Sequence, residues 1–210
     1  MIEHNEEFKK KFLKYNFAKD ILENEINILI KEYEYELGYN PVEHTKSRIK
    51  SLDSAINKLI KRKYEVNFEN LVNHIHDIVG IRIVCSFLSD VYEIANRIQN
   101  SKQFKIENIN DYIKEPKPSG YTSYHINVLI PVNLYASTEY IEAEIQIRTI
   151  AMDCWSSLDH KLRYKLPENI PEEIKIELKN RAEDMKELDK KMEDLHQMTI
   201  NYINNDDDII

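Results

Sequence analysis

The sequence predicts an α+β domain, or mixed α/β domain, with one sheet of four or five strands and long helices at both ends of the chain. Three observations support this fold class. Residues 3–37 contain no Gly or Pro, short β-branched segments occupy the middle of the chain from residue 78, and a long charged segment follows Pro171. A chain of 210 residues is long enough for one domain with helical extensions. We therefore expect one domain over residues 1–203 and a disordered acidic tail over residues 204–210.

Two helices are expected at the start of the chain. The first spans residues 3–37 and ends before Gly38 and Pro41. The second is expected from about His44 to Tyr64, because apolar residues recur there every three or four positions. A net charge of −8 argues against DNA binding by the whole surface, so a basic helix in such a protein predicts a site for a compact anion. Against a single acid, this segment carries seven basic residues: Lys46, Arg48, Lys50, Lys58, Lys61, Arg62 and Lys63.

Four strands are expected in the middle of the chain, at residues 78–85, 104–109, 121–131 and 140–148. Helices are expected at residues 90–100, 152–164 and 171–202. In the last strand, Glu142, Glu144, Gln146 and Arg148 alternate with apolar residues, so these polar side chains share one face. That face either lines a site or is a solvated edge, and for Glu142 we expect only the solvated face.

The composition excludes several classes of protein. The three glycines form no dinucleotide-binding or Walker-type loop, which excludes the common phosphate cradles. Cys85 and Cys154 have no C-x-x-C spacing and are expected to be reduced thiols. The N-terminus lacks the apolar segment of a secretory signal, and no apolar run is long enough to span a membrane. We therefore expect a cytoplasmic protein that does not bind a membrane.

Two carboxylates are candidates for metal binding. Asp77 lies at the entry of the first strand and Glu144 lies on the last strand, and Mg²⁺ prefers oxygen ligands together with substrate phosphates. Asp77 is also typical of a turn residue. Arg82, a charge inside an apolar strand, needs an anion, which is either a carboxylate or a substrate phosphate.

The segment after Lys117 offers a polar wall. Gly120 would let backbone approach a ligand, and the Tyr121 ring could stack on a base. Basic residues near the end of the helix after Trp155 could bind phosphate or simply interact with the helix dipole. Together these groups indicate metal-dependent nucleotidyl or phosphoryl transfer without a P-loop. Four polar residues share one face of the expected strand: Tyr121, Ser123, His125 and Asn127. The basic residues after Trp155 are His160, Lys161, Arg163 and Lys165.

Long motifs in the chain resemble the synthetase domain of RelA/SpoT-type proteins. They read D-I-V-G-I-R-I-V-C from Asp77, D-Y-I-K-E-P-K-P-S-G-Y-T-S-Y-H from Asp111 and E-A-E-I-Q-I-R-T from Glu142. The similarity covers roughly residues 20–200 and leaves no room for a hydrolase half, so the chain resembles a stand-alone small alarmone synthetase. The resemblance implies a nucleotidyltransferase-like fold, a homotetramer and transfer of pyrophosphate from ATP to the 3′-hydroxyl of GTP or GDP, with GMP as a further acceptor.

The resemblance also implies residue roles. Asp77 and Glu144 would bind Mg²⁺, with Mn²⁺ as an alternative, and Glu144 would act as general base with support from Gln146. Arg48 and Arg82 would sandwich the adenine of ATP. Lys50, Lys58 and Arg62 would contact the phosphates of ATP. Tyr121 would stack on guanine, with Lys117 and His125 at the acceptor's phosphates.

Some positions depart from the family pattern, and other functions compete. Asn110 stands where relatives often have Arg or Lys, which leaves the choice among guanine nucleotides open. Asp159 stands where Glu is usual, and Asp153 stands where Asn is frequent. The competing functions are a phosphohydrolase built on His76 and Asp77, and a regulatory or RNA-binding module that has lost catalysis. An active synthetase could also bind single-stranded RNA through its basic helix.

Overall fold

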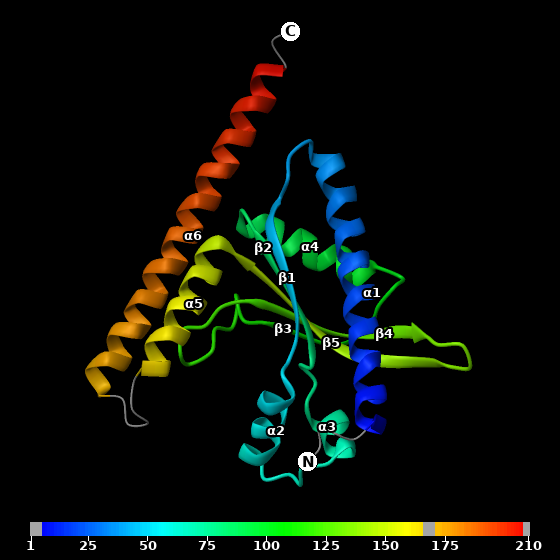
Figure 1. The fold of residues 1–210 in the computed structure, drawn as a ribbon. Coiled ribbons are helices and arrows are strands. Elements are labelled where there is room, and N and C mark those ends of the chain that lie inside the picture. The colour runs from blue at the N-terminus through cyan, green and yellow to red at the C-terminus, as the bar shows by residue number, and fades with distance from the viewer. Residues whose placement is uncertain (1–5, 166–170, 208–210) are drawn as a thin grey trace.

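The computed structural model describes residues 6–165 and 171–207 and forms an α+β fold (Figure 1). The helices are α1 (Glu6–Leu37), α2 (Leu52–Lys61), α3 (Phe68–His74), α4 (Leu88–Asn100), α5 (Ile150–Lys165) and α6 (Glu172–Asp207). The strands are β1 (Val42–Ile49), β2 (Val79–Cys85), β3 (Lys105–Asp111), β4 (Tyr124–Asn133) and β5 (Thr138–Thr149).

One mixed sheet of five strands lies at the centre of the fold, in the order β1-β2-β5-β4-β3. The central pair, β2 and β5, is parallel, and the other neighbouring pairs are antiparallel. Both central strands bury alternating apolar side chains, including Ile83, Ile145 and Ile147. The expected fold class, with four or five strands and long terminal helices, is confirmed.

Helices α1 and α4 cover one face of this sheet. Helix α1 packs across β1, β2, β4 and β5, and α4 packs on β2, β4 and β5. Leu22 and Ile26 of α1 and Ile94 and Ile98 of α4 are fully buried, at the 3–4 spacing of an amphipathic helix. Helices α5 and α6 pack together beside the end of the sheet, and α6 extends past it (Figure 1). Burial of the apolar side chains on one face leaves the opposite face for polar groups.

The helix expected from His44 to Tyr64 is wrong over its first half. Residues through Ile49 form the edge strand β1, which pairs with β2, and α2 begins only at Leu52, where the Ser51 side chain accepts a hydrogen bond from the backbone of Ser54. The apolar spacing from Ile49 suggested one helix, but Ile49 is the last residue of β1. Only the apolar residues from Leu52 onward lie on the helix α2. An exposed edge strand has few buried side chains to show a period of two.

Two other boundaries differ from the sequence-based expectation by three residues or more. The strand expected from Tyr121 begins at Tyr124, because a turn that starts at Lys117 precedes it. Helix α6 continues through Asp207, so residues 204–207 of the expected tail are helical, and residues 208–210 lie outside the described residues. The expected single domain stays a prediction. Within residues 6–165 and 171–207, no helix is long and apolar enough to cross a membrane.

Candidate active site

Two rows of polar side chains cross the open face of the sheet. The register of the strands produces them, because paired residues on neighbouring strands point to the same side. In the row that contains Arg48 and Glu144, Gly80 lies between them, so no side chain fills the space above β2 at that position. The first row is Arg48, Gly80, Glu144, Asn127 and Asn108, and the second is Lys46, Arg82, Gln146, His125 and Asn110.

A cleft of about 180 Å³ opens on this face near β1. It brings both predicted metal-binding carboxylates together with three cationic side chains from β1 and β2. The residues that line it are Lys46, Arg48, Asp77, Gly80, Ile81, Arg82, Glu144 and Gln146. Asp77 reaches the cleft from the turn between α3 and β2, and the backbone of Lys50 bonds to that of Ile78 at the same end.

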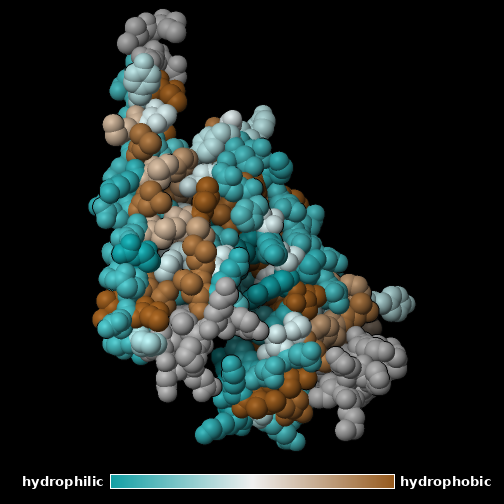
Figure 2. All heavy atoms as spheres, turned by 60° about the vertical axis from the view of Figure 1, so that its left-hand side comes forward, coloured by the Kyte–Doolittle hydropathy of each residue, from teal (hydrophilic) through white to brown (hydrophobic). Residues whose placement is uncertain are grey.

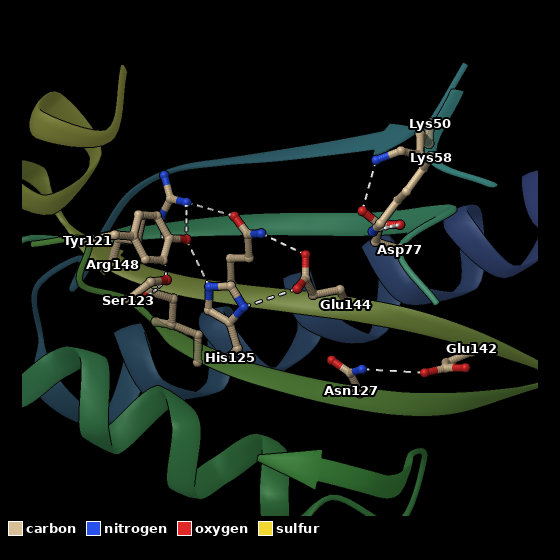
Figure 3. Close-up of polar contacts among 12 residues, drawn as sticks. Lys50, Lys58, Asp77, Tyr121, Ser123, His125, Asn127, Glu142, Glu144 and Arg148 are labelled. Atoms are coloured by element: carbon tan, nitrogen blue, oxygen red, sulfur yellow. Dashed lines mark hydrogen bonds and ion pairs between the residues drawn. The ribbon is translucent and has the colours of Figure 1, made fainter. Parts of the chain in front are cut away.

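The Asp77 carboxylate is held by two ammonium groups (Figure 3). Lys50 donates to one oxygen at 2.8 Å and Lys58 donates to the other at 3.0 Å. Burial acts to raise the pKa of Asp77, but the two lysine hydrogen bonds outweigh it and hold the pKa below its usual value. Asp77 is therefore a carboxylate at neutral pH.

The Glu144 carboxylate is held by side chains from its own strand and from β4. One oxygen lies 3.0 Å from His125 Nδ1, and the other accepts a hydrogen bond from Gln146 at 2.7 Å. Burial and the charge of Asp77 act to raise the pKa of Glu144, but the contacts with His125 and Gln146 lower it overall. Glu144 is thus ionised and able to accept a proton.

Tyr121 and Lys117 form a wall next to His125. The Tyr121 hydroxyl lies 2.9 Å from His125 Nε2, and the Lys117 ammonium lies 5.1 Å from the Tyr121 ring centroid and 4.3 Å from that of Tyr112. Asn110, where relatives often carry a cation, pairs with His125 in the register. The wall therefore has aromatic rings and one cation next to His125, which contacts Glu144.

Gly120 has a packing role that the sequence did not predict. Its φ is +80°, and a Cβ atom there would lie 2.5 Å from the Cβ of Ala182 on α6. The glycine is needed because the turn packs against a helix. The expected close approach of a ligand to this backbone stays a prediction.

Arg148 and Asp153 were not among the predicted site residues. The Arg148 side chain is buried, and it donates hydrogen bonds to Tyr121, Gln146 and Asp153. Asp153, in the first turn of α5, also pairs with Arg82 at 3.0 Å. The alternation in β5 did place Arg148 on the polar face in the sequence, but it gave this residue no role, and no local pattern joins Asp153 to Arg82.

Arg62 lies at the end of α2 and does not reach the cleft in this structure. Its guanidinium donates to the backbone carbonyl of His74, at 2.7 Å, and so joins α2 to α3. Of the basic residues near the end of α5, the two with described side chains do not line the cleft either. His160 and Lys161 are exposed, and the side chains of Arg163 and Lys165 lie outside the described residues.

Glu142 is not simply a solvated side chain, as expected. It contacts His76 Nδ1 at 2.7 Å. It also accepts a hydrogen bond from Asn127 at 3.4 Å (Figure 3). These contacts place His76 beside β5 and not in a helical cluster of metal ligands. Within the described part of the chain, no set of three or more His, Cys, Asp or Glu residues could hold a metal ion by itself.

Comparison with known proteins gives concordant matches. The family described as "Region found in RelA / SpoT proteins" matches residues 47–169. The chain is 47% identical over 187 residues to GTP pyrophosphokinase YwaC of Bacillus subtilis strain 168, covering 89% of each. It is similar to the crystal structure of small alarmone synthetase 2 from Bacillus subtilis, with TM-score 0.82, 45% identity and coverage of 92% of this chain and 100% of that chain. For small alarmone synthetase 1 from Bacillus subtilis bound to its product pppGpp, the TM-score is 0.84, the identity 31% and the coverage 92% and 98%.

Proposed function

Since the chain belongs to the family found in RelA and SpoT proteins, we propose that it is a small alarmone synthetase, a GTP pyrophosphokinase of the stringent response. It transfers the pyrophosphate of ATP to the 3′-hydroxyl of GTP or GDP. The observation that carries this proposal is the shared cleft, which holds the Asp77 and Glu144 carboxylates beside the cations of β1 and β2. A degenerate module would have no need to keep both carboxylates ionised in one cleft.

The donor nucleotide binds on the β1 side of the cleft. Arg48 and Arg82 line it from neighbouring strands, which suits two planar guanidinium groups that enclose an adenine. Lys50 and Lys58 lie at its edge on Asp77 and are within reach of the donor's phosphates once a metal ion neutralises that carboxylate. A phosphate contact from Arg62 requires it to leave the carbonyl of His74.

The residues of the cleft fit a magnesium ion that is bound together with a nucleotide. Asp77 and Glu144 supply carboxylate oxygens only, and Mg²⁺ typically takes one or two carboxylates plus substrate phosphates. Mn²⁺, with similar oxygen ligands, would serve as well. Bound there, the ion supplies Lewis-acid stabilisation of charge on the transferred group.

The acceptor binds on the β4 side, with its guanine on the Tyr121 ring and its phosphates near Lys117 and His125. Glu144 takes the proton from the 3′-hydroxyl as that oxygen attacks the β-phosphorus of ATP. The bond from the β-phosphorus to the α–β bridging oxygen breaks in line, and AMP leaves. Because Glu144 is already ionised, it needs no prior deprotonation.

The same protein is proposed to act in the cytoplasm as a homotetramer. Apolar side chains are exposed along α6, including Leu188, Met192, Leu195 and Met198 (Figure 2). Such a row on one helix is typical of a subunit contact. We expect any single-stranded RNA to bind to the basic residues of β1 and α2.

The test is product identification. The protein is incubated with Mg²⁺, labelled ATP and each of GMP, GDP and GTP, and the products are separated by chromatography. AMP together with a labelled guanosine 3′-diphosphate is the expected result, and the acceptors rank by rate. Folded protein that transfers label to none of the three acceptors would overturn the proposal.

A further inference from the structure

Arg148 uses nearly all of its donors inside the protein. Its side chain is 3% exposed, so the charge is removed from water. A buried guanidinium is costly unless its N–H groups are bonded. It donates to Ser123 at 3.4 Å, Asp153 at 3.0 Å, Tyr121 at 2.6 Å and Gln146 at 2.9 Å.

These bonds close a ring around the proposed base (Figure 3). One arc runs from Arg148 Nη2 through the Tyr121 hydroxyl and the His125 imidazole to one oxygen of Glu144. The other arc runs from the same Nη2 through the Gln146 amide to the second oxygen. One nitrogen atom therefore connects to both oxygens of the Glu144 carboxylate.

The ring is anchored outside the sheet. Asp153 at the start of α5 accepts from Arg148 Nη1 and pairs with Arg82, on the donor side of the cleft. Two guanidinium groups share one carboxylate oxygen. Burial, and next to it the charge of Arg148, lowers the pKa of Arg82 from its ordinary value. Arg148 thus joins the acceptor wall, the base and the donor wall.

We propose that Arg148 is a positioning residue, which fixes the Tyr121 ring and the Glu144 carboxylate relative to each other. This inference rests on the proposed function, because it concerns the distance between a guanine stacked on Tyr121 and the group that deprotonates its 3′-hydroxyl. A lysine could still pair with Asp153, but a single ammonium does not reproduce the planar fork that reaches Tyr121 and Gln146 together. Small errors in such a distance reduce turnover strongly.

The test is a double-mutant cycle between Arg148→Lys and Tyr121→Phe, which keeps the aromatic ring and removes only the hydroxyl. Each single change is expected to lower kcat about 10- to 100-fold. The dissociation constant for ATP should stay within about twofold, because Arg148 touches the donor wall only through Asp153. Since both changes open the same arc, the double variant should lose little more than the worse single variant.

The inference would be overturned if the fold-losses in kcat of the two single variants multiplied in the double variant. An unchanged kcat in Arg148→Lys would also overturn it. Arg97→Lys is the matched control, because Arg97 pairs with Glu36 and Glu93 on the helix-covered side of the sheet and should leave transfer unchanged. If Arg148→Lys does not fold, Gln146→Met, which opens the other arc, replaces it as a single variant. It should lower kcat about 10- to 100-fold with the dissociation constant for ATP within about twofold, and an unchanged kcat would overturn the inference. Absence of transfer by the wild-type protein instead contradicts the proposed function.

Discussion

At the Asp77 carboxyl, two ammonium groups occupy the oxygens that a metal ion would bind. Each oxygen is hydrogen-bonded to one lysine, at 2.8 and 3.0 Å. A cation that binds Asp77 must therefore displace Lys50 and Lys58, which are then released toward the phosphates of the donor. Metal and nucleotide are expected to bind together for this electrostatic reason.

We predict that Lys50→Met increases the affinity of the free protein for Mn²⁺ by roughly tenfold, because one competing cation is removed. Electron paramagnetic resonance of Mn²⁺, without nucleotide, measures this binding directly. Lys46→Met is the control, since Lys46 lines the same cleft and its change leaves both lysine contacts of Asp77 in place. Equal Mn²⁺ affinity in all three proteins would show that the lysines do not compete with the metal.

Between elements, the turn before β4 depends on contact with α6. Lys117 and Gly120 form a backbone hydrogen bond of 2.8 Å, and Gly120 packs on Ala182. Trp155 of α5, Leu178 and Ala182 form a small buried cluster at the same place. The position of Tyr121, which follows this turn, therefore depends on how α6 is docked.

Gly120→Ala should destabilise the protein more than Gly38→Ala. Both glycines have positive φ, at +80° and +73°, so each substitution costs about 1 kcal/mol of backbone strain. Only Gly120 would also place its new Cβ against α6, because nothing lies within 4 Å of that position at Gly38. Thermal unfolding measures the difference, and the Gly120 variant should also raise the KM for the acceptor. A larger loss of stability at Gly38 would contradict this packing.

Asp189 of α6 accepts a hydrogen bond from Thr149, at the end of β5. Burial, despite that bond, raises the pKa of Asp189 from 3.8 to about 6. The folded state therefore holds this proton more tightly than the unfolded chain, and the resulting stability is lost as pH rises from about 4 to 6. At neutral pH the ionised Asp189 carboxylate destabilises the docked helix.

Asp189→Asn should therefore raise the free energy of unfolding at pH 7.5, by roughly 2 kcal/mol, and change it little near pH 4. Denaturant unfolding at the two pH values measures this. Glu193→Gln is the contrasting variant, because the Glu193 carboxylate accepts from Ser89 and these contacts outweigh burial and lower its pKa. It should lose stability at pH 7.5. A gain from Asp189→Asn that is equal at both pH values would refute the assigned pKa.

For the molecule as a whole, the sequence predicted four strands of the sheet but not the edge strand β1. The alternation in β5 and the apolar run of β2 identified the two central strands, because burial on one or both faces imposes a pattern. Strand β1 was missed because most of its side chains are exposed. The carboxylates Asp77 and Glu144 could be predicted as a pair, since both lie on or next to strands that proved to be neighbours.

The links between remote side chains could not be predicted in the same way. The bonds from Arg148 to Tyr121 and Asp153 depend on the register of β4 with β5 and on where α5 begins. Nor does a local pattern show that Gly120 faces Ala182, because 62 residues separate them in the sequence. Such contacts come from tertiary packing alone.

The central claim is that Glu144, held between His125 and Gln146, is the base for pyrophosphate transfer from ATP. The most direct measurement compares transfer by the wild-type protein and by Glu144→Gln, with binding of a non-hydrolysable ATP analogue measured in parallel. We predict that kcat falls by about 10³-fold or more, as for loss of a general base, while binding of the analogue changes little. Near-normal turnover by Glu144→Gln would contradict the account.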